Sequence, residues 1–135
     1  MGASDNEALV RRLYSEVSAG NPAPLVEHLA DDVEWTIIDS TPLSGVYRGR
    51  DDVVTRLFGG LRAALAAPVQ FSFERFVSAG DSVVMEARGH ATTHDGRPYE
   101  NRYCIIFDVV DGKLQRIIDY VDTELINDVL FAGAA

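Results

Sequence analysis

Cysteine, histidine and basic residues are scarce in this sequence. Its 135 residues contain one cysteine, three histidines and 12 Lys and Arg, against 21 Asp and Glu. One cysteine excludes an internal disulfide and a cysteine-rich zinc site, and three scattered histidines predict no metal site. The formal net charge of −9 predicts no nucleic-acid partner, because a phosphate backbone is bound through Lys and Arg.

Long apolar runs and nucleotide-binding motifs are also missing. No apolar stretch approaches the roughly 20 residues of a membrane span, and the segment Cys104 to Phe107 has only the length of a strand. Residues Met1 to Glu7 lack the basic and apolar regions of a secretion signal. No phosphate-binding loop, nucleophile elbow or dinucleotide fingerprint occurs. We therefore expect a cytoplasmic protein with no membrane partner and no cofactor.

The length predicts one domain, residues 1–135, whose first half is mainly helical. A capping box, Ser4-x-x-Glu7, precedes the apolar stripe of a first helix that Gly20 ends, and Asn21-Pro22 begins a short second helix. Residues 33–39 alternate as a strand, and residues 40–50 predict a loop. A third helix begins at Asp51 or Asp52, and its Gly59-Gly60 pair indicates a bend or close packing.

The second half predicts four strands joined as a meander. Residues 69–78, 83–93, 99–110 and 114–121 alternate with the period of a strand, and a Gly-containing turn separates each from the next. Asp-Gly at 95–96 and at 111–112 is a strong hairpin signal. Thr123 can begin a short last helix. Helices kept apart from an antiparallel sheet predict an α+β fold with the helices on one face.

Several joints of this order have characteristic residues: Ser18-Ala19-Gly20-Asn21, Leu29-Ala30-Asp31-Asp32-Val33, Gly45-x-x-x-Gly49, Asp111-Gly112-Lys113-Leu114 and Asp119-Tyr120-Val121-Asp122. With them the chain resembles, over residues 7–131, the SnoaL-like and ketosteroid-isomerase-like branch of the nuclear transport factor 2-like superfamily. The resemblance implies a cone-shaped, curved, mixed or antiparallel sheet wrapped around three N-terminal helices. It also implies a central apolar pocket for a small-molecule ligand, a short C-terminal helix, and homodimers formed through the outer sheet face.

The resemblance also implies which strand positions face the pocket. They are Trp35, Ile37, Asp39, Glu86, Arg88, His90, Thr92, Arg102, Cys104, Ile106, Ile117, Asp119 and Val121. A two-residue turn at 111–112 agrees, because it pairs Cys104 with Asp119. A two-residue turn at 95–96 disagrees, because it pairs His90 with Asn101 and turns Arg88 and His90 to the face opposite Cys104. A one-residue bulge reverses that result.

If these positions face inward, three side chains form a candidate catalytic group. Burial raises the pKa of a carboxyl such as Asp119, which suits a general acid or base; His90 can relay a proton, and Arg88 can orient the carboxylate or hold an oxyanion. The open alternative is a buried Asp119–Arg88 ion pair that only specifies register, with His90 in solvent or in a dimer interface. The expected substrate-binding side chains are Trp35, Ile37, Asp39, Cys104, Ile117 and Val121.

Some of these positions have simpler explanations. Asp39 can belong to an Asx-turn, and Cys104 can be a small core residue. The polar and aromatic residues Tyr99, Asn101, Tyr103 and Tyr120 are expected on the outer face and in the dimer contact.

Three positions of this chain distinguish between the reactions known for the branch that it resembles. Ketosteroid isomerases need a base, a tyrosine and an acid where this chain has Ile37, Leu13 and Cys104, so that reaction is disfavoured. Asp119 matches the last-strand acid/base of SnoaL-like polyketide cyclases. We therefore expect a cofactor-independent cyclase or isomerase that acts on a small apolar or polycyclic carbonyl compound.

Two other functions remain open. Limonene-epoxide hydrolases match this chain at Asp119 and Arg88, but His90 stands where they have a second Asp. This difference weakens the case for epoxide hydrolysis, which stays an alternative. A non-enzymatic module for binding a small ligand or for dimerisation is the second alternative.

Overall fold

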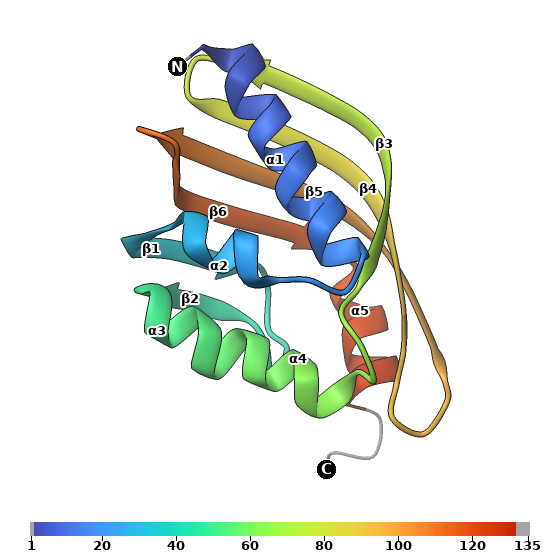
Figure 1. The fold of residues 1–135 in the computed structure, drawn as a ribbon. Helices are drawn as coiled ribbons and strands as arrows, with labels where there is room; N and C mark the ends of the chain where they lie inside the picture. The colour runs from blue at the N-terminus through green and yellow to red at the C-terminus, as the bar shows by residue number, and fades with distance from the viewer. Residues whose placement is uncertain (1, 132–135) are drawn as a thin grey trace.

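A curved six-stranded sheet forms one wall of the molecule, and the helices lie on its concave side (Figure 1). The computed structural model describes residues 2–131. In chain order the elements are α1 (Ala3–Ser18), α2 (Ala23–His28), β1 (Leu29–Ile37), β2 (Gly45–Arg48), α3 (Arg50–Asp52), η1 (Val53–Phe58), α4 (Gly59–Ala64), β3 (Gln70–Ala79), β4 (Ser82–Thr92), β5 (Pro98–Val110), β6 (Lys113–Val121), α5 (Thr123–Leu125) and η2 (Ile126–Leu130). The α+β class is confirmed. Among residues 2–131, no helix combines the length and hydrophobicity that a bilayer crossing requires.

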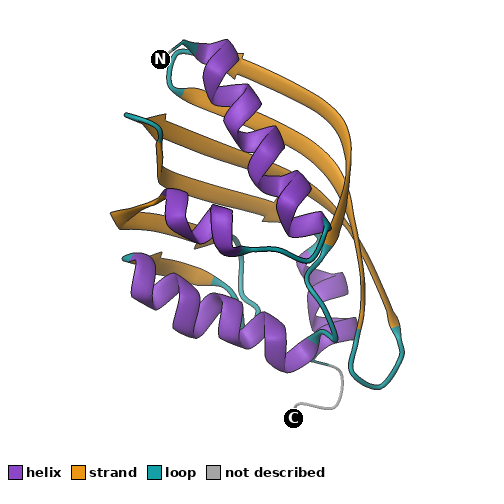
Figure 2. Ribbon diagram, viewed as in Figure 1, coloured by secondary structure: helices purple, strands orange, loops and turns teal. Residues whose placement is uncertain are grey.

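The strands lie in the order β2-β1-β6-β5-β4-β3 (Figure 2). The predicted meander is confirmed, because β3 to β6 are neighbours in sequence order and antiparallel. β1 lies parallel to β6 and thereby brings the first strand beside the last. This arrangement places side chains from the two ends of the sequence on one surface of the sheet.

The first helix buries the predicted apolar stripe but begins earlier than predicted. Val10, Leu13 and Tyr14 are almost completely buried, so the period of 3.6 residues is confirmed. Ser4 already lies inside α1, and the cap is formed by Asp5, whose carboxylate accepts a hydrogen bond from the Gly2 amide at 3.4 Å. The predicted partner of Ser4, Glu7, instead accepts from Ser78 and pairs with Arg11, which ties α1 to β3.

Residues 50–64 form one continuous helical segment whose middle part, η1, has the wider π turn. The Gly59-Gly60 pair lies inside it, and close packing is the reason for the second glycine. A Cβ at Gly60 would lie 2.9 Å from Cδ2 of Leu43. The segment therefore packs tightly on the loop after β1.

The stretch predicted as a loop contains a short strand. β2 pairs antiparallel with β1, and Tyr47, the register partner of Trp35, is buried. Only four residues long and bounded by glycines, β2 is too short for an alternating pattern to show.

One extra residue sets the register between β5 and β6. The predicted two-residue turn at 111–112 is confirmed: both residues have positive φ, 51° and 73°, and Val109 pairs with Leu114. The pairing then shifts by one, because Gln115 is an additional residue in β6. Beyond this bulge every side chain of β5 lies on the face opposite to the one that an unbulged hairpin would give it.

The bulge corrects the predicted pairing of Asp119. Its register partner is Ile105, so Cys104 faces the opposite side of the sheet. The hairpin between β4 and β5 also differs by one residue from a two-residue turn, since His90 pairs with Glu100 instead of Asn101. His90 and Cys104 therefore share a face, but it is the outer one.

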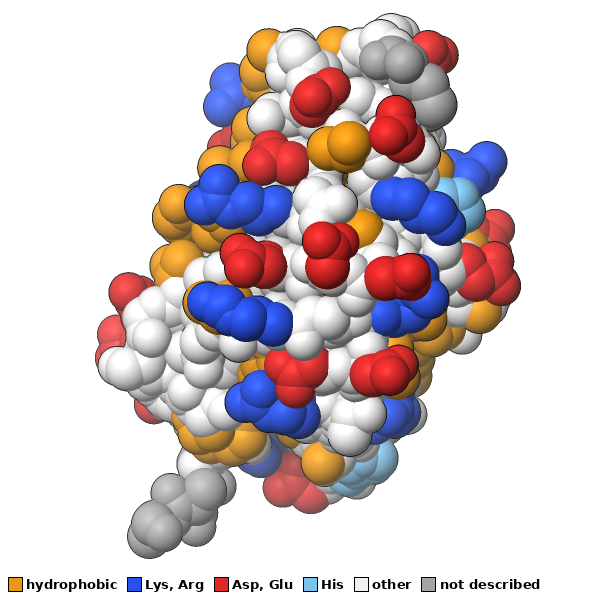
Figure 3. All heavy atoms as spheres, turned by 90° about the vertical axis from the view of Figure 1, so that its left-hand side faces the viewer, with side chains coloured by type: hydrophobic (Ala, Val, Ile, Leu, Met, Phe, Trp, Pro, Cys, Tyr) orange, Lys and Arg blue, Asp and Glu red, His pale blue; other side chains and the backbone are white. Residues whose placement is uncertain are grey.

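Charged side chains of both signs alternate on the side of the molecule shown in Figure 3. Ion pairs form between residues such as Arg56 and Asp52, whose charged atoms are 3.1 Å apart, and Arg50 and Asp31, whose charged atoms are 2.8 Å apart. Exposed pairs of this kind each contribute about 1 kcal/mol or less. The alternation therefore covers the core without forming a continuous charged patch on that side.

Candidate functional site

The concave face of the sheet and the helices enclose a cavity of about 450 Å³. Its lining is mainly apolar, and the aromatic side chains in it are Tyr14, Trp35, Phe58, Phe71, Tyr99 and Tyr103. A volume between 300 and 1,000 Å³ with apolar walls and a few polar groups is typical of a small-molecule site. Asp119 is the acidic side chain in this lining.

Asp119 has one oxygen with a partner and one without. It is 5% exposed; Oδ2 accepts a hydrogen bond of 2.5 Å from Nε1–H of Trp35, while Oδ1 has no hydrogen-bond partner among the described residues. Burial raises the pKa of this carboxyl to about 7, and the hydrogen bond from Trp35 opposes the rise. Such a carboxyl can both accept and donate a proton near neutral pH.

The parallel pairing of β1 and β6 brings Trp35 to this carboxyl. Ile37 is the register partner of Asp119, so Trp35 lies two residues away on the same face. The ring of Phe58 meets the indole edge-on, with the centroids 5.6 Å apart. Packing on a neighbouring aromatic ring holds the indole N–H in its position toward the carboxylate.

Two tyrosine side chains of β5 line the cavity, Tyr99 and Tyr103. The hydroxyl oxygens of Tyr99 and Tyr103 are 2.8 Å apart, and Nδ2 of Asn101 donates to the Tyr99 oxygen at 3.0 Å. Burial raises the pKa of both phenols, and the nearby Asp119 raises it further. Both phenols therefore remain protonated at neutral pH and can act as hydrogen-bond donors.

Tyr14 brings a third phenol to the cavity from α1. Burial raises its pKa well above the usual 10, and Asp119 adds to the rise. Its ring packs edge-on against Phe71 and Phe107, with centroid distances of 5.1 and 5.4 Å. Tyr14 is buried in α1, and it also lines the cavity.

The rim of the cavity joins the end of α4 to the loop between β4 and β5. Arg62 and His94 both line the cavity and are exposed. Nε2 of His94 donates to the carbonyl oxygen of Arg62 at 2.7 Å, and the amide of Ala66 donates to the carbonyl of Thr92 at 2.8 Å. These contacts fasten the tip of the β4–β5 hairpin over one edge of the entrance.

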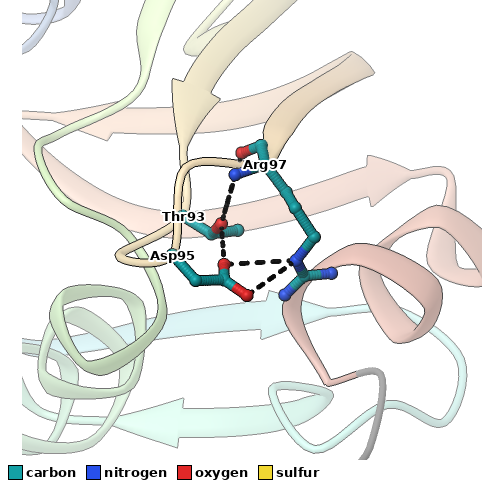
Figure 4. Close-up of polar contacts among 3 residues, drawn as sticks. All are labelled: Thr93, Asp95 and Arg97. Carbon is teal, nitrogen blue, oxygen red and sulfur yellow. Dashed lines mark hydrogen bonds and ion pairs between the residues drawn. The ribbon is translucent and has the colours of Figure 1, made fainter.

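The loop itself is held by the three side chains in Figure 4. The hydroxyl of Thr93 donates to Oδ1 of Asp95 at 2.5 Å and accepts from the amide of Arg97 at 2.9 Å. Nε of Arg97 lies 3.1 Å from both carboxylate oxygens. The hydrogen bond from Thr93, followed by that from Arg97, lowers the pKa of Asp95. This network keeps residue 94 at the rim.

Four of the predicted site residues lie where the sequence placed them. Asp119, Trp35, Ile37 and Val121 line the cavity. Ile117 is fully buried as the register partner of Trp35 and packs in the core beside the lining. The pocket face of β1 and β6 is therefore as expected.

Arg88, His90 and Cys104 lie on the outer face instead. Arg88 is exposed and pairs with Glu74 at 3.7 Å, and Nδ1 of His90 lies 3.3 Å from Glu100. Cys104 is half-buried opposite Glu86. The extra residue Gln115 is the cause, because it reverses the faces of β5 and β4 relative to Asp119. Neither a buried Asp119–Arg88 pair nor a His90 relay is formed.

Asp39 also lies outside the cavity lining. It follows β1 with a φ of 63°, is exposed, and accepts a hydrogen bond of 3.2 Å from the hydroxyl of Thr123. The residue ends the strand and ties its end to α5, as a loop aspartate does.

The side chains expected on the outer face included three that face inward: Tyr99, Asn101 and Tyr103. The signal that could have found them is Gly89, a glycine in the middle of β4. A Cβ there would contact the ring of Tyr103 and lie 2.8 Å from Cγ1 of Val69. A strand glycine marks such a close approach. Tyr120 does face outward and is 44% exposed, as expected.

No group of three or more His, Cys, Asp or Glu side chains comes together as a metal site within residues 2–131. The cavity's chemistry is thus that of one carboxyl, three phenols and an indole, with Arg62 and His94 at the rim.

Comparisons with known proteins identify a family and a relative of this chain. The SnoaL-like domain family matches residues 10–117. An uncharacterized protein of Mycobacterium tuberculosis is 30% identical over 112 residues, which are 83% of this chain and 85% of that protein.

Solved structures share the fold. A nuclear transport factor 2-like protein of unknown function from Burkholderia pseudomallei has a TM-score of 0.83 and 21% identity, covering 93% of this chain and 97% of its own. A putative SnoaL-like polyketide cyclase from Jannaschia has a TM-score of 0.78 and 15% identity, covering 96% and 94%.

Proposed function

This chain belongs to the SnoaL-like family of the nuclear transport factor 2-like superfamily, and from that premise we propose that it is a cofactor-independent enzyme of cyclase or isomerase type. Its proposed substrate is a small apolar or polycyclic carbonyl compound. Asp119 is the proposed proton-transfer group. The single observation that carries the proposal is a buried carboxyl with one unpartnered oxygen in the lining of an apolar cavity.

The proposed step begins with the ionised carboxylate. Asp119 removes a proton from the carbon next to the substrate carbonyl, and the electron pair of that C–H bond moves to the carbonyl oxygen as an enolate. In an isomerisation the protonated Asp119 returns the proton to another carbon. In a cyclisation the enolate carbon attacks a second carbonyl, and Asp119 gives its proton to the new alkoxide. Either sequence conserves atoms and electrons without an oxidant.

The walls of the cavity support the proposed substrate class. Trp35, Phe58 and Phe71 present aromatic surface, and the remaining lining is mostly aliphatic. Burying a fused ring system against such walls is favourable by about 25 cal/mol per Å² of apolar surface. A carbonyl on that ring system would lie among the phenols and Asp119.

The epoxide-hydrolase alternative loses support in this structure. That chemistry needs an arginine and a second polar residue beside the last-strand acid, and Arg88 and His90 both lie on the outer face. The observed neighbours of Asp119 are an indole and phenols, which suit enolate chemistry better than water activation.

Hydrogen–deuterium exchange tests the proposal directly. The protein would be incubated in D2O with cyclohexanone and 2-tetralone, and NMR would follow loss of the hydrogens on the carbons next to the carbonyl. We expect exchange above the buffer rate for at least one ring ketone. Asp119→Asn should reduce it by about 10²–10⁴-fold, the usual contribution of a general base.

Ligand-induced thermal stabilisation separates the enzyme from a binding module. Stabilisation by the ketones in both the wild type and Asp119→Asn, with exchange only in the wild type, supports the proposal. Stabilisation without any exchange in the wild type would instead identify a non-enzymatic ligand-binding protein.

A further inference from the structure

We propose that Tyr103 donates the hydrogen bond that holds the reacting carbonyl oxygen, at the end of a directed chain from Asn101 through Tyr99. This inference rests on the proposed function and adds the group that stabilises the enolate. Tyr103 would be a catalytic residue, whereas Tyr99 and Asn101 would be positioning residues.

The orientation of the Asn101 amide is determined by backbone groups. Its Oδ1 accepts from the amides of Arg102 at 2.7 Å and Asp122 at 3.1 Å, and its Nδ2 donates to the carbonyl of Asp122 at 3.1 Å. A backbone N–H can only donate and a carbonyl can only accept, so the amide cannot be flipped. The second proton of Nδ2 is therefore the one directed at Tyr99, 3.0 Å away.

This donor sets the direction of the next bond. The Tyr99 oxygen accepts a hydrogen bond from Asn101, and its other hydrogen-bond partner is the Tyr103 oxygen, 2.8 Å away. We therefore assign the Tyr99 hydroxyl as the donor to Tyr103, because this gives the Tyr99 proton an acceptor. Tyr99 is 2% exposed, so its side chain is shielded from bulk solvent. Tyr103 then accepts from Tyr99, and its own proton remains for a partner in the cavity. Hydrogen bonds in such a chain strengthen one another.

The sheet places Tyr103 close to Asp119. Tyr103 pairs with Val121 and Ile105 pairs with Asp119, so Tyr103 and Asp119 are diagonal neighbours on the inner face. Diagonal Cβ atoms lie roughly 7–8 Å apart or less, within reach of an aromatic side chain. The oxygen and the α-carbon of one carbonyl group can therefore face the phenol and the carboxylate at once.

The ring of Tyr103 is held by its surroundings. Phe71 packs edge-on against it with centroids 5.1 Å apart, and Gly89 offers backbone without a side chain beneath it. A donor held in place before the reaction stabilises developing charge without reorganising. As the enolate forms, the phenol keeps its proton and shares it with the oxygen.

The test uses three single-atom variants and two readouts. Tyr103→Phe removes the proposed donor, Tyr99→Phe removes the hydroxyl behind it, and Tyr120→Phe on the outer face is the matched control. Exchange of 2-tetralone in D2O is measured for each variant. The infrared carbonyl band of bound 2-tetralone is measured in the Asp119→Asn background, where exchange is expected to be slow.

We expect Tyr103→Phe to lower exchange by about 10²–10³-fold, the loss typical of one oxyanion donor. Tyr99→Phe should give a smaller loss, because Tyr103 keeps its proton, and Tyr120→Phe should give none. The carbonyl band should lie at lower wavenumber when Tyr103 is present than in the Tyr103→Phe variant, because a donor weakens the C=O bond.

This inference would be overturned if Tyr103→Phe exchanged 2-tetralone at the wild-type rate, or if its carbonyl band lay at the same wavenumber as with Tyr103 present. A larger loss of exchange rate in Tyr99→Phe than in Tyr103→Phe would also overturn it. If exchange depends on Asp119 but not on Tyr103, the proposed function stands and only the donor is wrong. If the wild type catalyses no exchange, the proposed function fails, while the infrared band still decides whether Tyr103 binds the carbonyl. Absence of ketone binding overturns both.

Discussion

Asp119 is the residue whose burial has the largest electrostatic consequence. Its carboxyl has an ordinary pKa of 3.8 and a pKa of about 7 in the folded protein. Between these values the folded chain binds a proton that the unfolded chain has released. Folding stability therefore decreases as the pH rises from about 4 to above 7, by up to roughly 4 kcal/mol if this group acts alone.

Asp119→Asn removes that dependence, because the amide is neutral at every pH. We expect the variant to be more stable than the wild type at pH 8.5, by up to a few kcal/mol, and close to it at pH 4.5. Urea unfolding of both proteins at the two pH values measures this. If the unfolding free energies of the wild type and Asp119→Asn differed by the same amount at pH 4.5 and pH 8.5, the raised pKa of Asp119 would be contradicted.

Trp35 is expected to tune the same carboxyl. Its N–H bond to Oδ2 favours the charged form, so Trp35→Phe should raise the pKa of Asp119 further. The pH at which ketone exchange reaches half its plateau should then lie above the wild-type value. Phe58→Leu is the control, because it changes the packing on the indole but keeps the N–H. A shift to lower pH in Trp35→Phe would contradict the assigned bond.

At the scale of elements, strand β4 is shaped by one glycine. Gly89→Ala would place a Cβ against the ring of Tyr103 and 2.8 Å from Val69. We expect a loss of about 1–3 kcal/mol in unfolding free energy, as for other overpacked sites, together with reduced ketone exchange. Gly59→Ala is the control: its Cβ would meet only ordinary contacts, and alanine favours a helix by up to about 1 kcal/mol. Equal stabilities of the two variants would contradict this packing.

The sequence predicts most elements because their patterns are long. The stripe of α1 and the alternation of the four late strands cover enough residues to show a clear period, and the Asp111-Gly112 turn was found by its residue types. β2 has too few residues for a pattern.

The sequence predicts the candidate site only in part, because one extra residue in β6, Gln115, changes which side chains face the cavity. The family resemblance places Asp119 and Trp35 in the pocket, and the buried faces of β1 and β6 agree with that placement. Gln115 then adds one residue to β6, and nothing in its side-chain type marks a bulge. This one insertion exchanges Arg88, His90 and Cys104 for Tyr99, Asn101 and Tyr103 as the side chains that share a face with Asp119.

At the scale of the whole molecule, the outer face of the sheet carries an apolar row. Register partners place side chains from all six strands in one line: Val77, Val84, Ile106, Ile118, Thr36 and Val46. Val77 and Val46 are 51% and 42% exposed. Five aliphatic side chains and one threonine in a row flanked by charges suit contact with a second copy, so we propose a homodimer through this face.

Light scattering after size-exclusion chromatography tests the proposed dimer. We expect the wild type to have twice the chain mass and Ile118→Glu to be monomeric, because the dimer would bury an unpaired charge. Val110→Glu, at the exposed end of β5, is the control and should remain dimeric. A monomeric wild type at micromolar concentration contradicts the proposed interface.

The most direct test of Asp119 as the acid/base group is its own titration. Carbon-detected NMR of aspartate carboxyls, with the Asp119 signal identified by its absence in Asp119→Asn, gives the midpoint in the folded protein. A midpoint of about 7 is expected from the buried, half-partnered carboxyl. A midpoint near 4, the value of an exposed aspartate, would contradict the central claim.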